Sequence, residues 1–140
     1  MANPRPVVHI TRRAEFSASH RYYDPKLSQE ENEKLFGSGA RPYGHGHNYA
    51  VELSVRGEVD PHTGIVVHTR HLKESIENIL KEWDHRNLNE LPEFSQAIPT
   101  LENIARILWH KLALNSVGKM GLERIRVYEE PELFVDYGGE

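Results

Sequence analysis

Hydrophobic and polar residues alternate along two stretches of the chain, and this period of two is typical of a strand with one buried face. In residues 7–19 the apolar side chains fall at even positions, and in residues 48–58 they fall at odd positions. The apolar positions are Val8, Ile10, Ala14, Phe16 and Ala18 in the first stretch, and Tyr49, Val51, Leu53 and Val55 in the second. We predict one strand in each stretch, with these residues directed toward a core.

Two segments further along have hydrophobic residues at helical spacing. The first stripe consists of Leu72, Ile76, Ile79 and Leu80, and the second of Leu101, Ile104, Ala105, Leu108 and Leu112. Thr100 stands immediately before the second stripe, where its hydroxyl could cap the helix. We therefore predict two amphipathic helices, separated by a loop over residues 83–99.

The remaining segments complete the order strand, irregular loop, strand, helix, helix, strand, strand. Residues 24–41 are polar and contain glycine, with one or two helical turns expected at Glu30–Phe36. Residues 122–129 and 133–137 alternate around Pro131 as a closing pair of strands. No internal repeat or linker interrupts this order, so we predict a single domain over residues 1–140.

Composition narrows the classes of protein to consider. The 140 residues are 38% hydrophobic, without an apolar run long enough to span a membrane, and Met1–Pro6 lacks the apolar core of a signal peptide. We expect a cytoplasmic protein without a membrane partner. The net charge of −4 and the lack of a basic stripe argue against a nucleic-acid partner. Cysteine is absent from the sequence, which excludes disulfides and thiolate metal ligands.

Three histidines are the strongest chemical signal. His45 and His47 share the odd, inward parity of their strand, and His20 continues the even, inward series of the first strand. Three neutral imidazoles leave one position of a tetrahedral zinc ion open for water or substrate, as in catalytic zinc sites. Unrelated surface or core histidines are the alternative, because the chain has nine of them. Because buried polar groups need partners, the shared inward parity favours a metal site.

Glu129 also falls on an apolar face. Ile125 and Val127 place the odd positions of the strand inward, and Glu129 continues them just before Pro131. A solvated strand end is one interpretation. If the carboxylate is buried, it could accept two parallel hydrogen bonds from a ligand that presents adjacent N–H groups.

A series of ordered motifs extends over nearly the whole chain. They are Phe16-Ser-Ala-Ser-His20, Glu30-Glu31-Asn32, Phe36-Gly37, Gly44-His-Gly-His-Asn-Tyr49, Gly57-Glu58-Val59-Asp60-Pro61, Thr63-Gly64, Asp84-His85-Arg86-Asn87-Leu88, Thr100-Leu-Glu-Asn103 and Val127-Tyr-Glu129. Together they resemble the 6-pyruvoyltetrahydropterin synthase family. The related 6-carboxytetrahydropterin synthases of queuosine biosynthesis share this framework, but the block ending at Tyr49 and the loop before it are more similar to the pyruvoyl branch.

The resemblance implies a role for each matching residue. The zinc ligands would be His20, His45 and His47, and the proton relay would be Asp84 and His85. The pterin's 2-amino and N3 groups would be anchored by Glu129, with Thr100 and Glu102 lining the pocket.

The resemblance also implies an α+β fold and an assembly, known as the tunnelling fold. Each subunit would contribute a four-stranded antiparallel sheet with two helices on one face. Three sheets would close into a barrel and two trimers would stack, giving a homohexamer with sites between subunits. Unpaired sheet edges in a chain of this length agree with such closure.

The reaction implied is that of a carbon–oxygen lyase acting on phosphates. Zinc would acidify the side chain of 7,8-dihydroneopterin triphosphate, allowing triphosphate elimination and rearrangement to 6-pyruvoyltetrahydropterin. In the family the base is a cysteine in the loop before the His-Gly-His motif, but Gly39 stands at that place here.

The missing thiol leaves several readings open. The chain could be a catalytically inactive pterin-binding variant, or the proton could be taken by His85 or by a hydroxide on the metal. It could also make other products, namely 6-carboxytetrahydropterin, or 6-hydroxymethylpterin by an aldolase-type cleavage.

Overall fold

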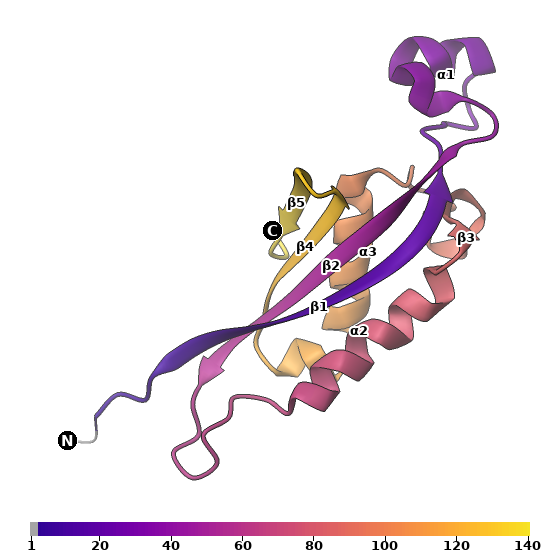
Figure 1. The fold of residues 1–140 in the computed structure, drawn as a ribbon. Helices are drawn as coiled ribbons and strands as arrows, with labels where there is room; N and C mark the ends of the chain where they lie inside the picture. Colours follow the sequence, from indigo (N-terminus) through magenta and orange to yellow (C-terminus); the bar gives the residue numbers. More distant parts are fainter. Residues whose placement is uncertain (1–2) are drawn as a thin grey trace.

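A mixed sheet of five strands forms the centre of the computed structural model, which describes residues 3–140 (Figure 1). The strands are β1 (Val7–His20), β2 (His45–Glu58), β3 (Arg86–Asn87), β4 (Leu122–Glu130) and β5 (Leu133–Tyr137). Their order across the sheet is β3-β1-β2-β4-β5, and only the β3–β1 pair is parallel within the described residues. The chain is therefore an α+β protein, as predicted.

The fifth strand corrects the prediction of a four-stranded antiparallel sheet. The two residues of β3 lie in the segment expected to be a loop and pair with Ala18 and Ser19 of β1. The His85 amide donates to the Ser17 carbonyl at 2.6 Å just before this strand. Two residues are too few to leave a periodic signal in the sequence. The strand forms because the chain returns alongside β1 after α2.

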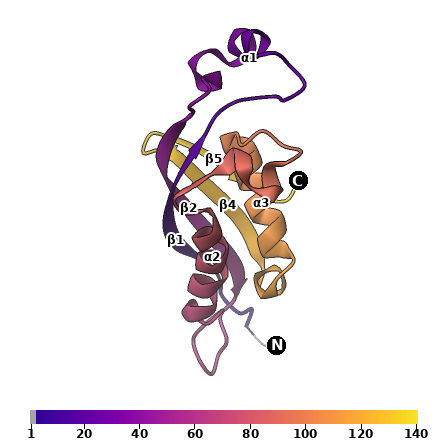
Figure 2. The ribbon, with the colours of Figure 1, turned by 90° about the vertical axis from the view of Figure 1, so that its right-hand side faces the viewer.

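Two helices cover one face of the sheet. They are α2 (Thr69–Trp83) and α3 (Leu101–Ala113), and both lie on the same side of β1, β2 and β4 (Figure 2). The predicted inward residues of β2 are fully buried against them, as are Leu72 and Ile76 of α2 and Leu108 of α3. Among residues 3–140, no helix combines the length and apolarity needed to cross a membrane.

The alternation of β1 and β2 is confirmed over most of its length. The two strands pair antiparallel without a register shift from Val7 opposite Glu58 to His20 opposite His45. Phe16 and Ala18 are buried as predicted, but Val8 is 39% exposed. The N-terminal end of β1 extends past both helices (Figure 1), which agrees with the partial exposure of Val8.

A third helix, α1 (Gln29–Phe36), lies beyond the other end of the β1–β2 pair (Figure 1). It begins with a capping box formed by Ser28 and Glu31. Asn32 is fully buried beneath it, where its Nδ2 donates to the carbonyls of Asp24 and Ser28, each at 3.0 Å, and its Oδ1 accepts from the Asp24 amide at 2.7 Å. A polar residue thus organises this loop.

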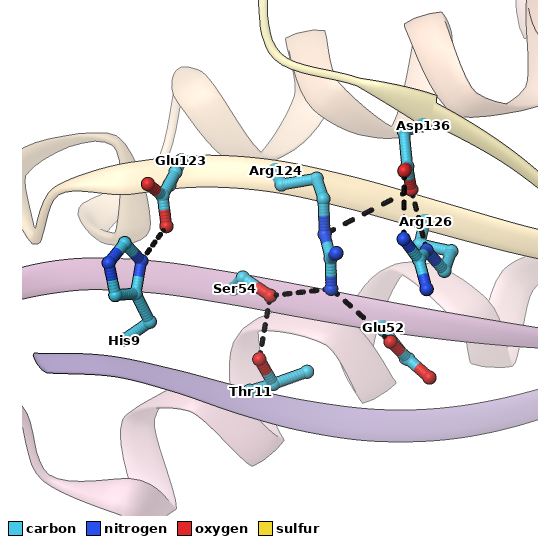
Figure 3. A network of polar contacts seen from close by, with 8 residues as sticks. All are labelled: His9, Thr11, Glu52, Ser54, Glu123, Arg124, Arg126 and Asp136. Carbon is cyan, nitrogen blue, oxygen red and sulfur yellow. Dashed lines mark hydrogen bonds and ion pairs between the residues drawn. The ribbon is translucent and has the colours of Figure 1, made fainter.

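The sheet face away from the helices carries a network of paired polar side chains (Figure 3). Arg126 of β4 donates two hydrogen bonds to Asp136 of β5, at 2.7 and 2.9 Å. Arg124 donates to Glu52 and Ser54, and Ser54 in turn contacts Thr11 at 2.7 Å. These partners satisfy most of the charged groups on this face, although Arg124 Nε is left without a hydrogen bond.

Candidate metal and ligand site

The ends of β1 and β2 bring the three predicted histidines together. His20 lies opposite His45 in the antiparallel register, and His47 lies two residues further along β2 on the same face. One ring nitrogen from each lies within 4.8 Å of the other two. The Nε2 atoms of His20 and His45 are 3.1 Å apart. Such convergence of three imidazoles fits a shared metal ion.

Neighbouring groups orient the His20 ring. Its Nδ1 lies 2.7 Å from the carbonyl of Pro99 and 3.3 Å from the hydroxyl of Tyr49. Because a carbonyl can only accept, Nδ1 carries the proton and donates it to Pro99. The Nε2 lone pair is therefore free and faces the other rings, as a metal ligand requires.

Burial keeps His20 neutral. Its side chain is 1% exposed, and burial lowers the pKa of His20 from 6.5 to about 4, with the nearby His45 and His47 rings acting in the same direction. Burial and the His47 ring also lower the pKa of His45, although this residue is the most exposed of the three. Neutral rings are the form that binds metal.

Glu129 lies beside the triad and has an unused acceptor. Its side chain is 11% exposed, so the interpretation as a solvated strand end is wrong. Its Oε1 lies 3.2 Å from His47 Nε2, but the two are not aligned for a hydrogen bond, and Glu129 Oε2 is buried without a partner. The β4–β5 register shifts between Tyr128 and Glu130, which is a bulge at this residue. A buried polar atom without a partner needs an explanation, and beside three converging histidines a bound ligand supplies one.

Tyr22 follows β1 and was not predicted to belong to the site. Its ring lies 5.3 Å from that of His20 and 6.4 Å from that of His45. Burial raises the pKa of Tyr22, and the negative charges of Glu129 and Glu102 raise it further. The Tyr22 ring therefore borders the triad.

Thr100 and Glu102 lie at the start of α3. The Thr100 hydroxyl accepts from the Asn103 amide at 3.1 Å, so the predicted N-cap is confirmed. Glu102 is exposed in the first turn of the helix, close enough to influence Tyr22. Pro99, immediately before the cap, supplies the carbonyl that orients His20.

Asp84 and His85 form a pair elsewhere on the molecule. Asp84 Oδ2 lies 2.9 Å from His85 Nδ1, and its Oδ1 accepts from the Ser17 amide at 2.8 Å. These hydrogen bonds, first the one from Ser17, lower the pKa of Asp84. His85 has a φ of 60°, a left-handed conformation that is uncommon for histidine and holds the ring outward.

The pair does not join the triad within one subunit. His85 lines a cavity of about 460 Å³ with Ser17, Ser19 and Asn48, which face away from the helices. Of the three triad residues, only His47 borders that cavity. The structure thus gathers the histidines, Glu129 and Tyr22 at one place, and presents Asp84–His85 at another.

The class defined by these observations is an α+β protein with three histidines gathered at the end of its sheet, a group that could hold a metal ion. A family model described as 6-pyruvoyl tetrahydropterin synthase matches residues 9–140. The chain belongs to that family, which confirms the resemblance found in the sequence.

Individual relatives cover nearly the whole chain. The 6-pyruvoyl tetrahydrobiopterin synthase of Homo sapiens is 45% identical over 134 residues, covering 94% of this chain and 91% of that protein. The structure of Caenorhabditis elegans 6-pyruvoyl tetrahydropterin synthase matches with a TM-score of 0.93 and 35% identity, covering 99% of this chain and 100% of that one. A dihydroneopterin monophosphate aldolase of Pyrococcus furiosus is 33% identical over 127 residues, covering 91% and 94%.

Proposed function

We propose that the chain is a zinc-dependent carbon–oxygen lyase acting on phosphates, which converts 7,8-dihydroneopterin triphosphate to 6-pyruvoyltetrahydropterin and triphosphate. The observation that carries the proposal is the convergence of His20, His45 and His47 beside the unpaired carboxylate oxygen of Glu129. The three histidines suit a metal, and the carboxylate suits a ligand that presents N–H groups. A pterin that carries hydroxyls next to its ring meets both demands.

The donor set fits zinc. His20 and His45 have lowered pKa values, and His47 Nε2 is buried without a hydrogen bond. Three neutral nitrogens with no thiolate are typical of zinc sites that keep a position open. When bound, zinc would supply Lewis acidity toward the hydroxyls of the substrate side chain.

Glu129 anchors the pterin ring in this proposal. An ionised carboxylate accepts two parallel hydrogen bonds, which match the 2-amino and N3 groups of a pterin. Thr100 and Glu102, at the start of α3, would line the same pocket. The anchor fixes the ring so that its side chain extends over the triad.

Asp84 and His85 carry protons in this proposal, at a site completed by a neighbouring subunit. Asp84 aligns the His85 ring through Nδ1, which leaves Nε2 for proton transfer. The pair opens on a cavity of its own, and β3 and β5 are sheet edges, which closure of three sheets into a barrel would cover. We therefore propose a homohexamer built as a dimer of trimers.

Product analysis tests the proposal. The protein is loaded with zinc and incubated with 7,8-dihydroneopterin triphosphate, and the products are separated by chromatography and identified by mass. We expect 6-pyruvoyltetrahydropterin and triphosphate, and no product from a variant with both His45→Ala and His47→Ala.

Other products would identify the alternatives. A hydroxymethyl product would indicate the aldolase reaction, a carboxy product would indicate the queuosine branch, and tight pterin binding without turnover would indicate an inactive variant. The pyruvoyl product is favoured because identity is 45% with the human synthase and 33% with the aldolase.

A further inference from the structure

Gly39 and Tyr22 share one space next to the triad. The Tyr22 amide donates to the Gly39 carbonyl at 2.8 Å, which ties the loop to the end of β1. A Cβ atom on residue 39 would lie 2.7 Å from Tyr22 Cδ2 and 3.4 Å from Cε2, and the first distance is shorter than real Cβ contacts. The φ of Gly39 is outside the left-handed region, so space rather than backbone conformation excludes a side chain here.

The Tyr22 ring therefore separates the loop from the triad. The ring centroid of Phe36 lies 5.8 Å from that of Tyr22. The rings of His20 and His45, which belong to the metal site, also lie next to the Tyr22 ring. A side chain at position 39 would reach toward the site only through the space that this ring fills.

The Tyr22 hydroxyl is not used within the part of the protein that the structure describes. A tyrosine phenol is a hydrogen-bond donor at neutral pH. No hydrogen bond within residues 3–140 uses this hydroxyl. Because the ring lies beside the rings of His20 and His45, an unused hydroxyl on it is placed to contact an oxygen of a ligand held at the triad.

We propose that Tyr22 is a substrate-contacting residue, whose hydroxyl donates a hydrogen bond to an oxygen of the pterin side chain held over the triad. The Tyr22 ring occupies the space that a longer side chain at residue 39 would otherwise take. This inference rests on the proposed function and deepens it, because it names a further residue that contacts the substrate.

The test compares Tyr22→Phe with Tyr23→Phe in the zinc-loaded protein. Tyr22→Phe keeps the ring against Gly39 and removes only the hydroxyl. We expect its kcat for 7,8-dihydroneopterin triphosphate to fall about 10–100-fold, with zinc content and melting temperature unchanged. Tyr23 is the matched control, because its ring stacks under the Arg21 guanidinium at 3.7 Å and its loss of a hydroxyl should change neither kcat nor KM.

A second variant tests the shared space. Gly39→Ala adds one methyl group where the Tyr22 ring lies, so we expect a loss of kcat close to that of Tyr22→Phe. In the Tyr22→Phe background, Gly39→Ala should reduce kcat by less than about 2-fold, since residues that act together are not additive. Full and independent losses in the double variant would contradict the proposed coupling of the two positions.

Two results separate failure of this inference from failure of the proposed function. Equal kcat and KM for Tyr22→Phe and the parent protein would overturn the inference while leaving the function intact. If the parent protein makes no product, the proposed function is wrong, and calorimetry with 7,8-dihydroneopterin triphosphate then decides the role of Tyr22. An affinity at least about 5-fold weaker for Tyr22→Phe supports the contact, and an unchanged affinity refutes it.

Discussion

Polar side chains lie on both faces of the same strands, and the two faces differ in how those side chains are paired. On the face away from the helices, Arg126 and Asp136 meet in a bidentate pair, and Arg124, whose Nε lacks a hydrogen bond, still lies 4.0 Å from Asp136 (Figure 3). On the helix side, His47 Nε2 and Glu129 Oε2 are buried without a hydrogen bond. Paired charges stabilise the sheet. Buried polar atoms without a partner lower its stability unless a ligand forms hydrogen bonds or metal bonds with them.

Removing two ligands should have the largest effect. With both His45→Ala and His47→Ala, we expect bound zinc to fall from one equivalent per subunit to background and turnover to fall by more than about 10³-fold. The metal-free fold should lose little stability, because His47 Nε2 has no hydrogen bond and His45 is exposed, with one contact to His20 Nε2. Elemental analysis and urea unfolding in the presence of a chelator measure both effects. Zinc retained by this variant would contradict the assignment.

The buried His20 should make the metal-free protein less stable in acid. In the unfolded chain His20 takes up a proton near pH 6.5, but in the folded protein its pKa is about 4. The unfolded state therefore binds more protons between these values, so stability is full above pH 6.5 and falls as the pH drops toward 4. We expect a loss of about 3 kcal/mol from this residue.

Urea unfolding of the chelator-treated protein across this pH range measures the loss. A variant with His20→Gln is the control, because glutamine has no proton to gain. If the parent and the variant lose stability in parallel, His20 is not buried as a neutral ring.

Glu129→Gln should weaken pterin binding and leave the metal in place. Exchanging the charged acceptor for an amide removes charge-assisted hydrogen bonds, at a cost of roughly 1.5–3 kcal/mol in binding free energy. Glu130→Gln, one residue further and exposed, is the matched control. Calorimetry with 7,8-dihydroneopterin triphosphate and zinc analysis are the measurements. Equal affinity in both variants would mean that Glu129 does not contact the ligand.

The smallest effect should come from the paired face. Asp136→Asn breaks the bidentate pair with Arg126, but Asp136 is 40% exposed, so we expect a loss of no more than about 1 kcal/mol in unfolding free energy. The loss should shrink in high salt because the pair is partly screened. Zinc content and pterin affinity should stay unchanged, and a change in either would show that the two faces are not independent.

The alternation of β1 and β2 predicted which face of the sheet carries the histidines. The same reasoning placed Glu129 inward, since strand period depends only on sequence position. The resemblance supplied Asp84 and His85, but their separation from the triad depends on where the chain turns after α2. That geometry leaves no periodic signal.

Tyr22 and Pro99 could not have been found in this way. Tyr22 follows the end of β1 and acquires its role through Gly39, a contact across an irregular loop. Pro99 contributes a backbone carbonyl, a group that every residue has. A cysteine at position 39, which the family pattern suggests as a simple repair, would meet the Tyr22 ring and requires a smaller residue at 22 as well.

The loop that Asn32 organises can change in sequence independently of the rest of the chain. The amide holds residues 24–32 together through backbone hydrogen bonds, and the main hydrophobic cluster within residues 3–140 draws no member from residues 24–41. Mutations near Gly39 can therefore accumulate without disturbing the packing of the sheet. The reactive group of this loop could therefore change during evolution while the metal ligands on β1 and β2 remain unchanged.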